Sequence, residues 1–264
     1  MTKYFLNRLI RRKLWWISIG GGCTISVLYF IFDVWMPGGL FDDTVYTKWI
    51  ECFSASEMQT LFFLVIPLLA AMAMADIYFV DKESGYLNVL FSKVKAKRYF
   101  RNLYCLNFCV GGLCLLLPLL VNLYLCFLVC PNRAPDLIVE GTNVVNYLGD
   151  ETLFPQLYYE HPFVHVCIYL LLGFLASGIF ASIALALSFF VKNRFLVWIS
   201  SFLINYIFIS LSVAITGNSK FALLSVCIMH GGAVTLQTAA IAIVSWIVVS
   251  MILYLIGVKC SEKY

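Results

Sequence analysis

Six long apolar runs, nearly free of charged residues, dominate this sequence. They lie at residues 14–35, 59–80, 103–130, 163–191, 195–216 and 233–258. A helix rises 1.5 Å per residue, so about 20 apolar residues are enough to cross the roughly 30 Å hydrocarbon core of a bilayer. We therefore predict an all-α integral membrane protein with six transmembrane helices, in a single domain that covers residues 1–264.

The composition excludes a soluble fold. Hydrophobic residues make up 62% of the chain and charged residues 12%, whereas soluble proteins average about 45–50% and 25%. Each segment outside the six runs has at most about forty residues, too few for a nucleotide-hydrolysing or nucleic-acid-binding domain of ordinary size. We therefore expect no enzyme activity, no cofactor and no nucleic-acid partner for this chain, and we expect any ATP hydrolysis to come from a partner protein.

The basic residues are distributed in a way that predicts the topology. Fifteen of the 18 lysines and arginines fall in four segments, at residues 3–13, 82–101, 192–194 and 259–263. These segments alternate with the apolar runs, so that every second connection is basic. Because loops rich in Lys and Arg stay on the cytoplasmic side, we predict that both termini are cytoplasmic. We also predict a multi-pass protein of the cell membrane, which would be the cytoplasmic membrane of a bacterium. The first run is longer than the apolar part of a signal peptide, about 7–15 residues, and we expect it to be retained.

The predicted spans contain few ionisable residues at mid-membrane depth. Asp33 and Asp76 lie near span ends, where a carboxylate can reach water, and Asn107, Asn122 and Asn205 are neutral. Ion-coupled transporters place titratable groups within the bilayer. Intramembrane hydrolases need a catalytic motif such as HExxH or GxSxG, and this sequence has neither. The pattern therefore disfavours both classes of protein.

Two histidines at the start of the fourth span are the only candidates for a metal site. His161 and His165 are one helical turn apart, and Glu160 precedes them, so the three side chains could face one ion. The alternative is that both histidines join Tyr158 and Tyr159 in a belt of amphipathic rings at headgroup depth. We favour the belt and predict no metal.

The most informative segment lies between the second and third spans, ADIYFVDKESGYLNVLFSKVKAKRYFRNL at residues 75–103. Its apolar stripe has the spacing i, i+3, i+4 and i+7 of one helix face, at Leu87, Leu90, Phe91 and Val94. Acidic residues precede the stripe and lysines follow it, as the helix dipole favours. From the residues alone, the stripe can lie in the headgroup layer, with the basic residues on anionic lipid, or dock on a cytoplasmic partner.

Residues 81–92, DKESGYLNVLFS, resemble the acidic-x-E-x-G-T-L-x-x-L-L-S segment of ABC-2-type permeases. These permeases are the membrane subunits of ATP-binding-cassette exporters. In that family the segment lies between the second and third spans and forms the coupling helix that contacts the ATPase. Six spans and a basic amphipathic start are also similar to the family. Three departures, Tyr86 for Thr, Lys93–Lys95 for a Pro and Arg101–Asn102 for Gly-Lys, indicate a divergent branch.

The resemblance implies a permease that works with two copies of an ATPase subunit and with a second copy of itself or a sister permease. Its substrate would be hydrophobic or amphipathic, such as an antimicrobial peptide, an antibiotic or a lipid. The coupling role would fall to seven residues: Asp81, Glu83, Gly85, Leu87, Leu90, Phe91 and Val94. The apolar stripe would be the docking face, and the two acidic residues would be polar clamps. The alternative is a non-transporting immunity or sensor protein that binds a peptide or lipid at its outer loops, residues 37–58 and 131–162.

Two further segments fit this layout. Residues 2–13 separate apolar from basic side chains, which predicts an interfacial helix before the first span; positive charge that merely flanks the span explains the basic residues equally well. Residues 221–229 form an apolar run that is too short to cross the bilayer. We expect there a short helix that dips into the outer leaflet, or else a patch that a second copy covers.

Overall fold

The computed structural model describes residues 2–37, 43–50, 56–136, 152–229 and 234–261. These residues form helices joined by turns and short connections, and no strand occurs among them. In chain order the helices are α1 (Thr2–Ile10), α2 (Lys13–Tyr29), the π-helical turn η1 (Phe30–Trp35), α3 (Val45–Lys48), α4 (Glu57–Met74), α5 (Ile77–Glu83), α6 (Tyr86–Lys93), α7 (Ala96–Val129), α9 (Pro155–Glu160), α10 (Pro162–Leu187), α11 (Arg194–Thr216), α12 (Leu223–Cys227) and α13 (Leu236–Ser261).

Six of the helical stretches are long and apolar enough to cross a membrane, which confirms the predicted spans. They are Lys13–Trp35, Glu57–Glu83, Ala96–Val129, Pro162–Leu187, Arg194–Thr216 and Leu236–Ser261. The main difference in bounds is at α7, which begins at Ala96 rather than at residue 103. Its first turns carry Lys97, Arg98 and Arg101, because a helix can continue beyond the hydrocarbon layer when long basic side chains reach water.

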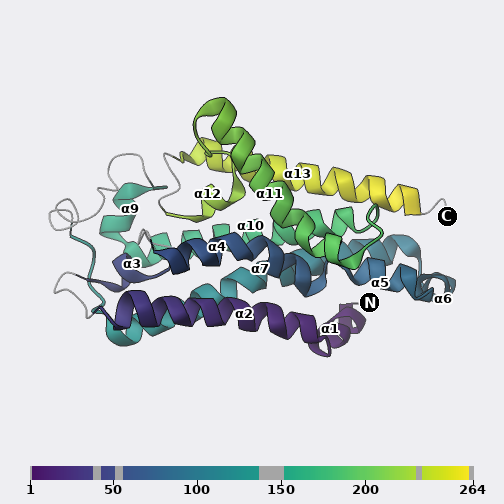
Figure 1. The fold of residues 1–264 in the computed structure, drawn as a ribbon, viewed down its shortest axis with the longest axis horizontal. Coiled ribbons are helices and arrows are strands. Elements are labelled where there is room, and N and C mark those ends of the chain that lie inside the picture. The colour runs from purple at the N-terminus through teal and green to yellow at the C-terminus, as the bar shows by residue number, and fades with distance from the viewer. Residues whose placement is uncertain (1, 38–42, 51–55, 137–151, 230–233, 262–264) are drawn as a thin grey trace.

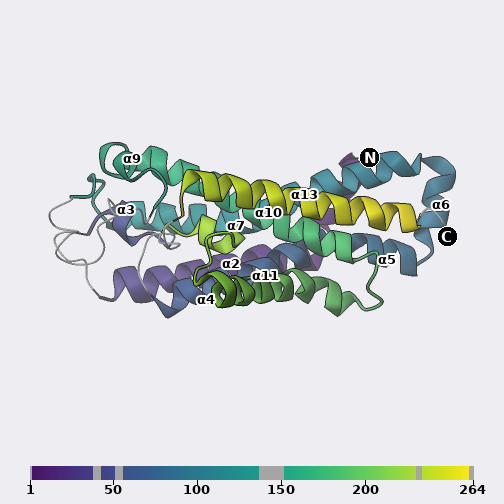
Figure 2. The same cartoon turned by 90° about the horizontal axis from the view of Figure 1, so that it is seen from above.

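The spans lie along the long axis of an elongated bundle (Figures 1 and 2). Both chain termini, α1, α5 and α6 lie at one end, which we call the terminal end; α3 and α9 lie at the other, which we call the loop end. The four basic segments of the sequence therefore meet at the terminal end. α10 is the central helix and packs against α4, α7, α11 and α13.

Small residues allow the central helices to approach closely. A Cβ added to Gly178 of α10 would lie 2.9 Å from the carbonyl oxygen of Phe108 on α7, and one added to Gly112 would lie 2.8 Å from that of Phe174. Beside them, the Ser177 hydroxyl donates to the Gly111 carbonyl at 2.7 Å. Helices in a bilayer associate through such backbone proximity and interhelical hydrogen bonds, since lipid supplies no hydrophobic driving force.

At the loop end, a short segment folds back into the bundle. Trp49 and Ile50 are fully buried. The Ile50 amide donates to the side-chain oxygen of Asn122 at 2.9 Å, and the Asn122 amide group donates to the Ser26 carbonyl at 3.1 Å. Asn122 thus joins helices, as its neutral amide predicted.

The expected short helix after the fifth span exists as α12. Leu223, Val226 and Cys227 are buried, and α12 packs against α10 and α13. Its position in the outer leaflet stays a prediction. The run is apolar because the chain's own bundle covers it.

Candidate functional site

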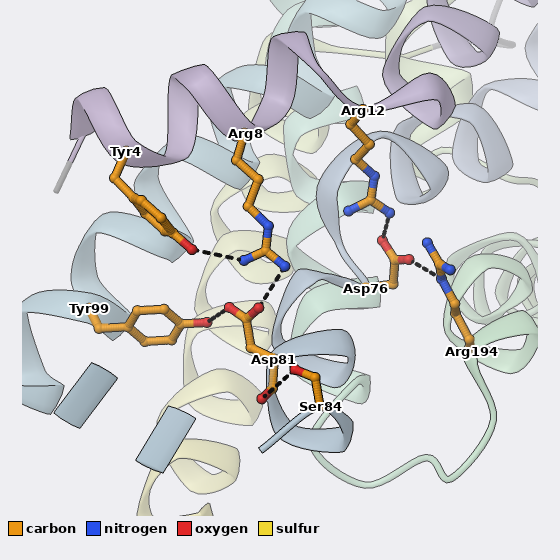
Figure 3. Close-up of polar contacts among 8 residues, drawn as sticks. All are labelled: Tyr4, Arg8, Arg12, Asp76, Asp81, Ser84, Tyr99 and Arg194. Atoms are coloured by element: carbon orange, nitrogen blue, oxygen red, sulfur yellow. Dashed lines mark hydrogen bonds and ion pairs between the residues drawn. The ribbon is translucent and has the colours of Figure 1, made fainter. Parts of the chain in front are cut away.

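The second span is broken where it reaches the terminal end. α4 stops at Met74 and α5 starts at Ile77, and Asp76 occupies the turn between them with no exposed surface. Its carboxylate accepts hydrogen bonds from Arg12, which follows α1, and from Nε of Arg194 at 2.5 Å, at the start of α11. Figure 3 shows the two guanidinium groups on either side of this carboxylate. The sequence prediction that Asp76 reaches water is wrong, because two basic side chains take the place of water.

A second buried carboxylate lies one helical turn further on. Asp81 of α5 forms an ion pair with Arg8 of α1 at 2.6 Å and accepts a hydrogen bond from the Tyr99 hydroxyl of α7 at 2.8 Å (Figure 3). Arg8 also donates to the Tyr4 hydroxyl at 3.4 Å. Asp81 is 1% exposed on its side chain, so it clamps elements of this chain together and is not available to a partner.

Burial and charge act against each other on these side chains. Burial alone would lower the pKa of Arg8, but the hydrogen bond and charge of Asp81 raise it above its ordinary value. Burial lowers the pKa of Arg12, although Asp76 opposes that effect. Burial also raises the pKa of the Tyr4 phenol to about 12. At neutral pH both arginines are therefore charged and the phenol is neutral.

Aromatic rings hold α1 against α6 and α7 beside the ion pairs. Phe5 and Tyr99 are fully buried, with ring centroids 5.5 Å apart, and Phe91 meets Tyr99 edge-on at 5.7 Å. Tyr4 stacks on Tyr86 at 6.3 Å. α1 therefore has a protein-facing side, to which the buried Leu9 also belongs, whereas Leu6 and Ile10 are exposed.

A glycine turn orients α6. Gly85 has φ of +70°, in the left-handed region that a residue with a Cβ rarely adopts, and its amide donates to the Lys82 carbonyl at 3.1 Å. The turn separates α5, which is tied down by Asp81, from α6. Glu83, Ser84 and Gly85 are exposed at this corner.

The apolar stripe of α6 faces the bundle. Leu87 and Leu90 are buried in the same cluster as Phe5 and Tyr99, and Phe91 is half-buried against that cluster. The chain itself therefore covers the two central leucines of the stripe, and the docking role of the stripe stays a prediction. Val94, at the end of α6, is also half-buried.

The opposite face of α6 is open, with clefts on two sides. Its exposed residues include Asn88, Val89, Ser92 and Lys93. One cleft, of about 470 Å³, runs from Lys82 and Asn88 to Ser261 at the end of α13, and two residues of the stripe, Leu87 and Phe91, also line it. The other lies between α6 and α1 and is lined by Tyr4, Ser84 and Val89 among others. A partner at the terminal end would therefore meet the Gly85 corner and the outer face of α6.

The predicted histidine pair lies at the loop end. His161 is exposed, whereas His165 is buried. The Nε2 of His165 lies 2.7 Å from the Leu153 carbonyl oxygen, and its ring lies beside the rings of Tyr158 and Tyr169. Among the residues that the structure describes, no three His, Cys, Asp or Glu side chains form a group that could hold a metal ion.

No family model, curated protein or solved structure matches this chain.

A cluster of polar contacts joins several helices at the terminal end. Five residues that sequence reasoning did not select carry it: Arg8, Arg12, Asp76, Tyr99 and Arg194. Through them the α5–α6 corner is joined to α1, to α7 and to α11. The sequence held one signal of this cluster, because Asp76 and Asp81 are acidic residues within the most basic part of the chain.

Proposed function

We propose that this chain is the membrane-spanning permease subunit of an ABC-2-type exporter. Two copies of a separate ATPase subunit would bind at the terminal end, which would face the cytoplasm. A second copy of the chain or a sister permease would complete the unit. The substrate class that fits the apolar spans is a hydrophobic or amphipathic molecule, such as an antimicrobial peptide, an antibiotic or a lipid.

The observation that carries the proposal is that the α5–α6 corner is exposed on its outer face and held by buried polar contacts on its inner face. Its outer face is open at the Gly85 turn and at Val89, which is 57% exposed. Its inner face is tied to α1, α7 and α11 by two buried carboxylates. A segment with one face free for a partner and the other fixed to several spans is suited to pass a displacement on to those spans.

In the proposed cycle, ATP binding by the partner moves α6, and the ion pairs carry that motion to the ends of the first, second and fifth spans. A partner shifts such an equilibrium only by as much as it favours one arrangement over the other. The polar clamps act inside this chain, at Asp81 and Asp76, and the contact with the ATPase falls to exposed residues such as Glu83, Asn88 and Val89.

Substitution of Val89 by Asp tests this proposal without disturbing the core. Replacement of the buried Leu90 would confuse loss of docking with loss of folding, whereas Val89 points outward. A docking contact of this kind contributes about 2 kcal/mol, which corresponds to a roughly thirty-fold loss of affinity. Cys260→Asp is the matched control, since Cys260 is exposed at the same end but lies on α13.

The measurement is isolation of the tagged full chain from its native membrane, followed by identification of co-isolated chains and assay of ATP hydrolysis. We expect a chain with a Walker-type ATP site to accompany the wild type and the Cys260→Asp variant, and to be lost with Val89→Asp. Isolation of the wild-type chain without any ATPase would contradict the proposal and favour the immunity or sensor alternative.

A further inference from the structure

Four arginines line an open cleft of about 600 Å³ at the terminal end. α1 and the residues after it supply Arg8, Arg11 and Arg12, and Arg194 comes from the start of α11. Tyr4, Asn7 and Val80 complete the lining, and no carboxylate is part of it. The cleft lies where the first and fifth spans begin and where the second ends.

The charges in this cleft do not balance. Arg8 pairs with Asp81, while Arg12 and Arg194 share Asp76. Arg11 is exposed and has no carboxylate within ion-pair distance in the part of the chain that the structure describes. Within the described part of the chain, four guanidinium groups thus face two carboxylates, an excess of two positive charges.

The guanidinium groups are held in place before any ligand arrives. Asp76 and Asp81 fix three of them, and Arg194 also lies over the Trp198 ring, with 5.1 Å between its Cζ and the ring centroid. Guanidinium groups bind phosphate oxygens through paired N–H donors, and fixed ones lose little conformational entropy on binding. The chemistry of the cleft therefore selects a phosphate-bearing anion.

The surroundings favour a lipid over a free anion. Three apolar residues close in sequence to the cleft's arginines are each more than half exposed: Ile10, Trp16 and Phe195. Each lies within four residues of one of the cleft's arginines and at the border of a predicted span. Acyl chains could lie on these apolar side chains while the phosphate occupies the arginine cleft.

We propose that this cleft is a binding site for an anionic phospholipid, with the phosphodiester held by Arg11 together with Arg8, Arg12 and Arg194. The site joins α1 to the start of the fifth span and does not depend on the transport function proposed above. An occupied site would neutralise the excess positive charge and add a second link between these two elements, beside the one through Asp76.

The test uses the purified full chain in a neutral detergent and a fluorescent phosphatidylglycerol, whose displacement by unlabelled phosphatidylglycerol gives the affinity. Arg11→Gln removes the arginine of the cleft for which no described residue supplies an ion pair, so the fold is expected to survive. Loss of a hydrogen bond to a charged group predicts binding weaker by about ten-fold or more. The matched control is Lys3→Gln, which removes the same charge from α1 at an exposed position outside the cleft.

A second variant acts without removing an arginine. Asn7→Asp places a carboxylate in the cleft, one helical turn before Arg11, where an i,i+4 pair would neutralise that guanidinium. We expect it to weaken lipid binding about as much as Arg11→Gln does. Both variants are compared with the wild type by size-exclusion profile, so that loss of binding is read only on folded protein.

Two further competitors separate the possible ligands. Diacylglycerol has the acyl chains without the phosphate and should not displace the probe, and inorganic phosphate should displace it only at a large excess. Displacement by inorganic phosphate at the concentrations at which the lipid acts would assign the cleft to a free phosphate and overturn the lipid assignment. Equal losses in Arg11→Gln and Lys3→Gln would overturn the site itself, since they would indicate diffuse attraction to the basic end.

Discussion

Replacement of Asp76 by Asn should be among the most destabilising single changes at the terminal end. The carboxylate has no exposed surface, and the two guanidinium groups that share it differ in exposure: the side chain of Arg12 is 13% exposed and that of Arg194 is 43% exposed. Removal of one partner of a buried ion pair costs about 3–5 kcal/mol, because the remaining charge stays buried. We expect about 3 kcal/mol for Asp76→Asn, at the low end because the amide oxygen still accepts a hydrogen bond.

Two further variants test whether Asp76 is the counterion of both arginines. Arg194→Gln should lower the free energy of unfolding by about 1 kcal/mol. Asp76 would keep its pair with Arg12, and the side chain of Arg194 is nearly half exposed, so solvent screens its charge. The double variant Arg12→Gln, Asp76→Asn removes the orphaned charge as well as its partner. It should therefore cost less than the sum of the two single changes, by about 1 kcal/mol or more.

Unfolding of the purified chain by SDS in mixed micelles, followed by tryptophan fluorescence, measures these differences. Equal costs for Asp76→Asn and Arg194→Gln, or strict additivity in the double variant, would refute the reasoning. Either result would mean that Asp76 does not act as the shared counterion of two spans.

Three other changes probe the packing in the same assay. Gly178→Ala should lower the free energy of unfolding by about 1–3 kcal/mol, because its Cβ would press on the Phe108 carbonyl. Gly20→Ala, where an added Cβ would meet no atom within 4 Å, should leave the free energy of unfolding unchanged or raise it by up to about 1 kcal/mol. Equal effects of the two changes would contradict the close approach of α7 and α10. Tyr99→Phe removes a hydrogen bond to Asp81 and should cost about 1–2 kcal/mol, and no change would mean that Arg8 alone satisfies that carboxylate. Asn122→Leu should cost about 1–3 kcal/mol by leaving the Ile50 amide unpaired at the loop end, and a neutral result would show that water replaces the lost partner.

The sequence was sufficient for the spans because a bilayer imposes a length and a polarity that can be read locally. Each predicted span overlaps one observed span. The ends were less accurate where helices extend past the hydrocarbon, as α7 does through Lys97, Arg98 and Arg101. The side of the membrane that each end faces remains a prediction from the basic residues.

The site could be predicted only in part. Periodicity identified the stripe of α6 but not what covers it, and Leu87 and Leu90 turned out to be buried in a cluster that includes residues of α1 and α7. The partners of Asp76 are 64 and 118 residues away in the sequence, and no local pattern connects them. A charged residue near a span end can be solvated or paired, and only the folded arrangement distinguishes the two.

The shared carboxylate also has a consequence for the order in which the chain assembles. Arg12 is synthesised before Asp76, so their pair can form as soon as the second span has entered the membrane. Arg194 follows Asp76 by 118 residues, and the bridge is completed only when the fifth span arrives. Until then the carboxylate of Asp76 is neutralised by Arg12 alone, and no polar contact through Asp76 joins the second span to the fifth.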